Sequence, residues 1–368
     1  MPKNIVICCD GTANEFARDR TNVIKLYSVL EHDPASQVTY YHPGLGTLEP
    51  VGALSPWRRR FMRVLGKAFG YGLEHDVRDV YAFLMHCYEP GDKVFLFGFS
   101  RGAYTVRAVA SLLRACGLLR PDNEPLIPYA IRVLNGIQRA KGAAAVHEAF
   151  RLVDEFKAVL SRGDCKPWFV GVWDTVSSVG WIENPLRLPH VADNADIEVG
   201  RHAISIDERR AFFRTNLWRP GTDPARPHGP KDLLQVWFPG VHSDVGGGYP
   251  ETQSGLSKIA LEWMLEEAEK FGLRVDQGRK QDVLGRAPGS SYTAPDPTAD
   301  RHESLKGFGW HVAEFVPKRH FDRKTGKEGR RMNLYRRRTI PPGSLIHNSA
   351  YQRGAEYVKL LPADGIQV

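Results

Sequence analysis

A serine held between two glycines is the first residue of this chain whose surroundings suit a chemical reaction. The segment Gly98–Gly102 follows the pattern Gly-x-Ser-x-Gly with Ser100 at its centre, directly behind the apolar run Val94–Phe97. Apolar residues at helical spacing come next, so the segment predicts a strand, a sharp turn and a helix. Such a turn exposes a serine hydroxyl, and the two glycines remove Cβ atoms that would clash. We therefore predict a nucleophilic serine; the alternative is a serine that only caps the helix.

A serine hydroxyl is a weak nucleophile and needs a base and an orienting acid, which in this kind of site follow in the order serine, acid, histidine. Asp174 stands at the end of the apolar run Trp168–Trp173, and His242 stands in a glycine-rich loop after the run Leu233–Phe238. In an open α/β sheet the loops after the strands carry the active site. The chain order therefore predicts a catalytic triad of Ser100, Asp174 and His242.

Four short sequence blocks carry a resemblance to a known family: Cys9–Asn14, Gly98–Ala103, Val172–Val176 and Trp237–Gly248. A weaker one follows at Ile346–Ser349. In these blocks the chain resembles an uncharacterised α/β-hydrolase family (DUF2235-like) that includes phospholipase effectors of the bacterial type VI secretion system. The third and fourth blocks are more specific than the serine motif alone.

The resemblance implies an α/β-hydrolase fold and hydrolysis of carboxylic esters, with phospholipids as the substrate of the characterised toxins. The family's triad maps onto Ser100, Asp174 and His242, and no metal or organic cofactor is implied. Two other functions stay open on the residues alone. One is a soluble esterase of small, non-lipid esters, and the other is a hydrolase-like module that binds a partner without catalysis.

Ester hydrolysis also needs an oxyanion hole, a set of N–H donors aimed at the developing negative charge. In this class one donor is the backbone N–H of the residue after the nucleophile, which is Arg101 here. The second comes from a loop after an earlier strand. Gly11 or Thr12 is the preferred candidate, and the glycine-rich loop at Gly44 is the alternative.

Two aspartates near the predicted site have two interpretations each. Asp10 directly follows the first apolar run, and Asp244 lies two residues beyond His242. Either could be a second carboxylate at the site, acting on the histidine loop or on a cation. Either could instead satisfy the backbone N–H groups of its own turn, which is the commoner use of an aspartate after a strand.

The balance of charge is basic, with a formal net charge of +8. This favours anionic partners such as phospholipid headgroups. Arg58–Arg60, next to Trp57 and Phe61, forms either a solvated face or a basic amphipathic helix that contacts an anionic membrane. A second basic run ends at Arg336–Arg338. The sequence contains no recognised nucleic-acid-binding module, so a nucleic-acid partner is not predicted.

Composition favours a large folded domain, because 368 residues of which 42% are hydrophobic can bury a sizeable core. The beginning of the sequence has no signal-peptide pattern, and no apolar stretch reaches the ~18 residues of a membrane span. The five cysteines are odd in number and scattered, without zinc-ligand spacing, which is typical of reduced thiols. These features predict a cytoplasmic protein, whereas the resemblance adds a secreted effector as the second prediction. The oligomeric state is not predicted.

Alternating strand and helix patterns predict an α/β fold, with a mostly parallel sheet flanked by helices, in a single domain over residues 1–368. Predicted strands cover 5–9, 38–41, 94–97, 168–173 and 233–238; predicted helices cover 22–31, 73–88, 127–160 and 256–271. The helical part of residues 120–165 is a predicted cap. A further helix is predicted to begin at 203–208, and 274–300 is predicted to be loop.

Overall fold

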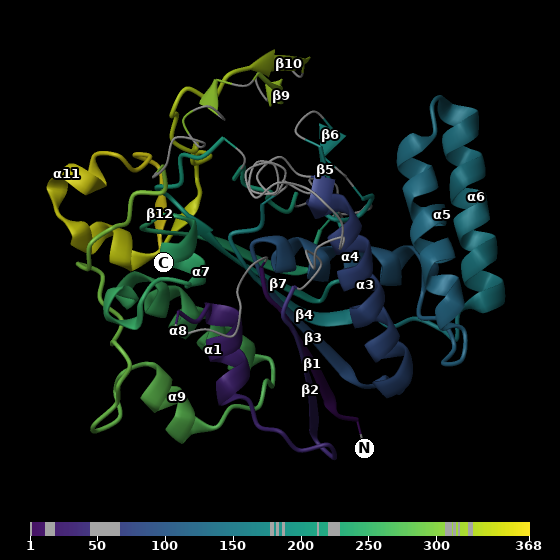
Figure 1. The fold of residues 1–368 in the computed structure, drawn as a ribbon, viewed down its shortest axis with the longest axis horizontal. Coiled ribbons are helices and arrows are strands. Elements are labelled where there is room, and N and C mark those ends of the chain that lie inside the picture. Colours follow the sequence, from purple (N-terminus) through teal and green to yellow (C-terminus); the bar gives the residue numbers. More distant parts are fainter. Residues whose placement is uncertain are drawn as a thin grey trace, which may run out of the picture.

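The computed structural model of this chain describes residues 2–11, 19–44, 67–176, 180–181, 184–185, 188–211, 213–219, 229–305, 311, 314–315, 317–322 and 327–368. A twisted central sheet crosses the molecule, and helices cover both of its faces (Figure 1). The basic segment Arg58–Arg60, with Trp57 and Phe61, lies outside the described residues, as does Thr12.

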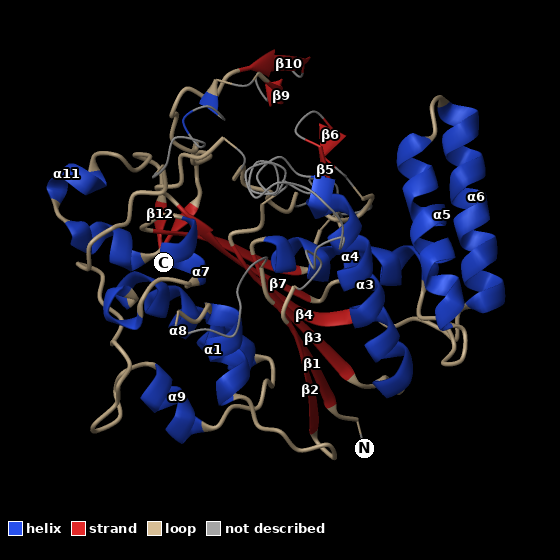
Figure 2. Ribbon diagram, in the orientation of Figure 1, coloured by secondary structure: helices blue, strands red, loops and turns tan. Residues whose placement is uncertain are grey.

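The central sheet of the described residues has eight strands in the order β12-β11-β8-β7-β4-β3-β1-β2 (Figure 2). Every neighbouring pair is parallel, which confirms the predicted fold class. The strands are β1 Asn4–Cys9, β2 Gln37–His42, β3 Lys93–Phe99, β4 Pro167–Trp173, β7 Val199–Ser205, β8 Asp232–Phe238, β11 Leu345–Ile346 and β12 Ile366–Gln367. Two short antiparallel pairs lie apart from it: β5 Gly180–Trp181 with β6 Asn184–Pro185, and β9 Lys318–Asp322 with β10 Lys327–Arg331.

Alternate residues of the central strands point into two separate cores. In β1, Ile5 and Ile7 pack in one core, and Val6 and Cys8 pack in the other. The first core lies under α3 Lys67–Cys87, α4 Arg101–Cys116, α5 Ile127–Arg139 and α6 Ala143–Leu160. The second lies under α1 Asn22–Val29, α8 Gly255–Lys270 and α9 Gln277–Val283. The remaining short helices are η1 Glu124–Leu126, α7 His242–Gly246, η2 Glu251–Gln253, η3 Asn348–Arg353 and α11 Ala355–Val358.

Residues 127–160 are helical, as predicted. Helices α5 and α6 form a hairpin that packs against α4 and projects at one end of the molecule (Figure 1). The hairpin adds a further layer outside α3 and α4. Its role as a cap over the site stays a prediction.

The helix predicted to begin at 203–208 is wrong. Residues Val199–Ser205 form strand β7, which lies between β4 and β8 and is buried along its whole length. Gly200, Arg201 and His202 interrupt the apolar residues of this strand and are buried with them, so the sequence shows neither an apolar run nor alternation there. The segment 274–300 also differs from the prediction, since it contains the short helix α9. The side chain of Asp276 accepts a hydrogen bond from the N–H of Arg279 and so caps this helix.

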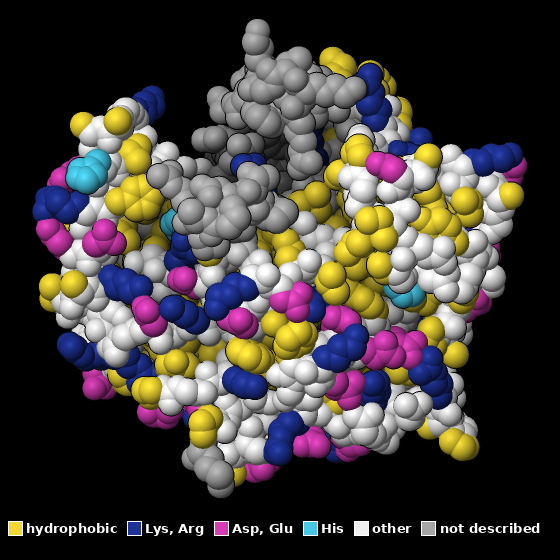
Figure 3. All heavy atoms as spheres, turned by 180° about the vertical axis from the view of Figure 1, so that it is seen from behind, with side chains coloured by type: hydrophobic (Ala, Val, Ile, Leu, Met, Phe, Trp, Pro, Cys, Tyr) yellow, Lys and Arg dark blue, Asp and Glu magenta, His cyan; other side chains and the backbone are white. Residues whose placement is uncertain are grey.

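The surface of the described residues mixes both signs of charge. On the face drawn in Figure 3, Lys and Arg side chains are interspersed with those of Asp and Glu. The described residues on this face therefore present no extended field of one sign. No helix within the described ranges is both long and apolar enough to cross a membrane.

Candidate active site

Ser100 stands at the turn between β3 and α4 in a strained backbone conformation. Its φ of 58° and ψ of −116° are rarely adopted by a residue with a side chain. The N–H of Ser100 donates to the carbonyl of Trp173 at 3.1 Å, which ties the turn to the end of β4. A Cβ on Gly98 would lie 2.5 Å from the Gly102 carbonyl oxygen, and a Cβ on Gly102 would lie 2.1 Å from that of Cys9. The two glycines are therefore what allows strand, turn and helix to pack this closely.

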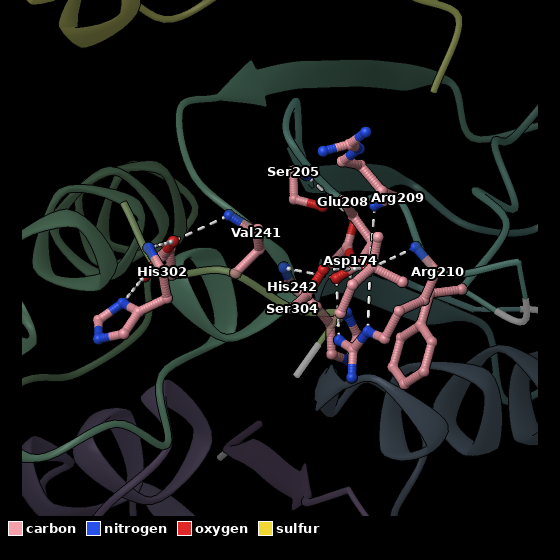
Figure 4. A network of polar contacts seen from close by, with 12 residues as sticks. Asp174, Ser205, Glu208, Arg209, Arg210, Val241, His242, His302 and Ser304 are labelled. Atoms are coloured by element: carbon pink, nitrogen blue, oxygen red, sulfur yellow. Dashed lines mark hydrogen bonds and ion pairs between the residues drawn. The ribbon is translucent and has the colours of Figure 1, made fainter. Parts of the chain in front are cut away.

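Asp174 and His242 are joined directly. The Nδ1–H of His242 donates to Oδ2 of Asp174 at 2.5 Å (Figure 4). Asp174 directly follows β4 and is fully buried. The N–H of Ser205, at the end of β7, donates to its other oxygen at 3.0 Å. The bond to Asp174 fixes the proton on Nδ1 and leaves the Nε2 lone pair of His242 available as a base.

The imidazole of His242 lies between two aromatic rings. Its centroid is 4.6 Å from that of Phe99 and 4.7 Å from that of Phe213. Its Nε2 is buried and has no hydrogen-bond partner among the described residues. Burial lowers the pKa of His242, and the bond to Asp174 opposes this only in part. The ring is therefore neutral near pH 7, as a general base has to be.

The register of strands β3 and β4 places Ser100 at the same edge of the sheet as Asp174. Phe99 pairs with Trp173 across β3 and β4, so Ser100 and Asp174 each follow a paired residue by one position. The ring of Phe99, next to Ser100 in the chain, is the one that contacts His242. Ser100 and Asp174 thus both follow strands at the carboxyl edge of the sheet, where an α/β fold places its sites, and His242 is bonded to Asp174 there. The described residues show no hydrogen bond between Ser100 and Nε2 of His242.

Arg338 donates hydrogen bonds to both oxygens of the Asp174 carboxylate. The sequence did not predict this contact. Nη1 of Arg338 donates to Oδ1 of Asp174 at 2.5 Å and its Nη2 to Oδ2 at 3.1 Å. The side chain is only 7% exposed. Burial would raise the pKa of Asp174, but the charge of Arg338 and the bond from His242 hold this pKa well below its usual range. In the sequence, Arg338 is one of three consecutive arginines, and no local signal separates it from the other two.

Asp207 and Glu208 support the histidine loop, and the sequence did not single them out for this. Glu208 is buried and accepts hydrogen bonds from the backbone N–H of His242 at 3.2 Å and from the Ser304 hydroxyl at 3.0 Å (Figure 4). Burial would raise the pKa of Glu208, but the bond and charge of Arg210 lower it to about 2. Asp207 accepts from the N–H of Gly240 at 2.8 Å. Both carboxylates therefore hold the backbone around His242.

Asp244 braces its own loop. It accepts hydrogen bonds from the N–H of Val241 at 2.9 Å and from both the backbone N–H and the Nδ1–H of His302, at 3.1 and 2.6 Å. Burial raises the pKa of Asp244, and these bonds oppose the rise. The contacts favour the structural interpretation of Asp244.

Asp10 is likewise engaged with its own turn. It accepts from the N–H of Gly11 at 2.7 Å and from the hydroxyls of Thr21 and Tyr41 at 2.5 and 3.0 Å. The Asp10–Gly11 backbone packs against the serine turn, because the Cβ positions of Gly102 and Gly44 both point at the Asp10 carbonyl oxygen from 2.6 Å.

The predicted oxyanion donors differ in whether their backbone N–H already has a hydrogen-bond partner. The N–H of Gly11 is taken by Asp10, and the N–H of Gly44 donates to Nδ1 of His42 at 3.2 Å. Arg101 is the first residue of α4, where backbone N–H groups lack helical partners. Of the described candidates, Arg101 is therefore the one whose backbone N–H has no partner assigned by its helix, whereas Thr12 lies outside the described residues. Within the described ranges, no three His, Cys, Asp or Glu side chains are grouped to hold a metal.

Comparison with known proteins places the chain in a family. Residues 3–267 match the family model described as "T6SS, Phospholipase effector Tle1-like, catalytic domain". The chain belongs to this family. The match contains all three predicted triad residues, Ser100, Asp174 and His242, whereas Arg338 lies beyond it.

Individual relatives are more distant and longer. The "Uncharacterized protein YEL023C" of Saccharomyces cerevisiae is 27% identical over 427 aligned positions, which cover 82% of this chain and 61% of that protein. The chain thus spans about three-fifths of this curated relative. A crystal structure of an uncharacterized protein from Pseudomonas aeruginosa is 20% identical with a TM-score of 0.46, over 74% of this chain and 46% of that one. A structure of the Tle1 effector bound to the VgrG spike of the type 6 secretion system is 18% identical with a TM-score of 0.34, over 69% and 52%.

Proposed function

We propose that this protein is a serine hydrolase that cleaves the carboxylic esters of phospholipids through Ser100, His242 and Asp174. The observation that carries the proposal is the bond from Nδ1 of His242 to buried Asp174, in an imidazole whose Nε2 has no partner among the described residues and whose ring packs on Phe99, the residue before Ser100. Membership of a phospholipase-effector family supports the ester and the lipid parts of the proposal.

The reaction runs in two halves. The Oγ of Ser100 bonds to the ester carbonyl carbon while its proton passes to Nε2 of His242. The backbone N–H of Arg101, with a second donor from the loop that contains Thr12, stabilises the tetrahedral oxyanion. When the intermediate collapses, the ester C–O bond breaks and His242 returns the proton to the leaving alcohol. Water then attacks the acyl-serine with His242 as the base, which releases the fatty acid.

Asp174 keeps the imidazole in the required tautomer and stabilises the imidazolium that forms. Its two oxygens are held by Ser205, Arg338 and His242. The carboxylate therefore stays ionised and fixed throughout the cycle.

The lipid surface and the biological setting belong to the same proposal. We include in the proposal contact with an anionic membrane through Arg58–Arg60, which the basic charge supports, and delivery as a secreted effector, which membership of the family supports. Each cation near an anionic surface contributes about 1 kcal/mol. Replacing the three arginines with Gln should weaken binding to anionic vesicles about a hundredfold and leave hydrolysis of a soluble ester unchanged.

Labelling with a fluorophosphonate probe and hydrolysis of phospholipid vesicles test the proposal directly. The wild type should be labelled and should release fatty acid, and Ser100→Ala should do neither. Ser243→Ala is the matched control, because this partly exposed serine directly follows His242. If the wild-type protein is not labelled and hydrolyses no ester, the proposal is wrong and the remaining hypothesis is a hydrolase-like module that binds a partner. Activity on short p-nitrophenyl esters without activity on vesicles would leave a small-ester esterase.

A further inference from the structure

The guanidinium of Arg338 is fully occupied by the groups around the proposed triad acid. Besides its bonds to both oxygens of Asp174, its Nη1 donates to the Ser205 hydroxyl at 2.7 Å, and its Nε donates to the Phe213 carbonyl at 3.1 Å. Nη2 also donates to that carbonyl. All five N–H donors of the side chain are thus used. None is left for a substrate, so the role of Arg338 is exerted through its neighbours.

These neighbours are the ones that position His242. Asp174 holds the Nδ1 side of the imidazole, and the ring of Phe213 packs edge-on against it. Arg338 is bonded to the carboxylate of the first and the carbonyl of the second. One side chain therefore fixes two of the groups that contact the proposed base.

We propose that Arg338 is a positioning residue for ester hydrolysis, one that orients Asp174 and Phe213 against His242 and balances the charge around the imidazole. The proposal rests on the triad proposed above. It assigns a part in the reaction to a segment that lies outside the matched region of the family.

The charges around His242 come from several elements and are nearly balanced. The nearest set has two carboxylates and two guanidiniums: Asp174 after β4 and Glu208 and Arg210 after β7 act on the imidazole, and Arg338 acts on both of these carboxylates. Others are paired or neutral: Asp244 on α7 with His302, Arg101 on α4 with Asp76, and His202 on β7, whose pKa burial lowers to about 3. Without Arg338 the nearest set carries one excess negative charge. Such a charge favours the imidazolium and so raises the pKa of His242, which reduces the share of free base at a given pH.

Arg338→Gln tests whether Arg338 affects catalysis through its charge and its contacts, apart from any effect on the stability of the fold. The pH profile of kcat/KM reports the pKa of the free-enzyme base. We expect the acidic limb of this profile to move up by about one pH unit, because an opposite charge nearby shifts a pKa by one to three units. The plateau above the limb should fall about tenfold to a hundredfold, because the acid is less well placed. Arg336→Gln is the matched control, since Arg336 is exposed and belongs to the same basic run.

A charge-retaining variant and a spectroscopic measurement complete the test. Arg338→Lys keeps the charge but not the forked geometry, so its limb should stay in place while its plateau falls. In a Ser100→Ala background, proton NMR of the His242 Nδ1–H should show a higher pKa after Arg338→Gln. A wild-type profile in Arg338→Gln, or a lowered plateau with an unmoved limb and an unmoved NMR pKa, would overturn the proposal. If Arg338→Gln does not fold, Arg338→Lys decides, and a wild-type plateau there would overturn it. A wild type without activity would instead refute the proposed function.

Discussion

On the Ser100 side of the site the backbone does the positioning, whereas on the His242 side charged side chains do. The serine side consists of Gly98–Gly102 packed against the Asp10–Gly11 turn, at distances that leave no room for a Cβ. The histidine side consists of Asp174 and His242 with the charged residues Glu208 and Arg338 around them. The turn of the first is set by the consecutive residues Gly98–Gly102, which then pack on the distant Asp10–Gly11 turn. The second depends on charged residues from four separate parts of the chain.

This difference predicts which kinds of substitution each side tolerates least. A side built from close backbone contacts is sensitive to added volume, because its neighbours cannot move away. A side built from buried charges is sensitive to the loss of one partner, because the other is left uncompensated. Volume changes should therefore break the serine side, and charge or pH changes should break the histidine side.

The largest expected effect is on kcat and comes from removing Ser100 or His242, one residue from each side. Ser100→Ala and His242→Ala should each reduce kcat by about 10⁴- to 10⁶-fold, and the double variant should be no worse than either one, because triad members act as a unit. Steady-state kinetics on one soluble ester measures all three. Losses that multiply in the double variant would show that the two sides do not form one catalytic unit.

The second comparison lies within the histidine side. Asp174→Asn should reduce kcat by about 10⁴-fold, because His242 would then be held in the wrong tautomer. Asp244→Asn should change kcat less than tenfold but lower the free energy of unfolding by about 1–3 kcal/mol, because it weakens the buried bonds to Val241 and His302. Kinetics and urea denaturation of both variants check this. The opposite ranking in kcat would make Asp244 the acid of the triad.

A glycine pair tests the serine side. Gly102→Ala places a Cβ 2.1 Å from the Cys9 carbonyl oxygen, so we expect a loss of about 1–3 kcal/mol in stability and a fall in activity. Gly136→Ala is the matched control, because nothing lies within 4 Å of its Cβ position in helix α5. It should gain about 0.5–1 kcal/mol, the usual benefit of removing a glycine from a helix. Thermal melts measure both, and a stable, active Gly102→Ala would refute the backbone account.

The last prediction concerns how the free energy of unfolding depends on pH through His347, which follows β11 beside the strand that leads to His242. Burial lowers the pKa of His347 to about 4, below its ordinary value of 6.5. The unfolded chain therefore binds one more proton than the folded chain between these two values, so this contribution to stability is complete above pH 6.5 and falls as the pH drops towards 4. His347→Asn should make the decline in unfolding free energy shallower by up to about 1.4 kcal/mol per pH unit. Urea denaturation between pH 4 and 8 measures it, and equal slopes would contradict the assignment.

The sequence was informative where positioning is local. The strand, turn and helix at Gly98–Gly102 and the loop after β8 are visible in consecutive residues, so the places of Ser100 and His242 in the fold could be predicted together with β1, β2, β3, β4 and β8. Strand β7 was missed because burial on both faces removes the alternation that identifies a strand. Arg338 was missed because its partners lie 164 and 125 positions away, and only the folded chain shows which of three arginines reaches Asp174.

The same separation has a consequence for biosynthesis. A ribosome releases residues 98–242 well before residue 338, and domains generally begin to fold from the N-terminal side. A nascent chain can thus form the strained serine turn while Asp174 still lacks its cation. Closing a loop of 164 residues is slow compared with forming the local turn, because contacts of high sequence separation form late. The bond between Arg338 and Asp174 therefore forms only after the residues of strands β1–β8 have been synthesised.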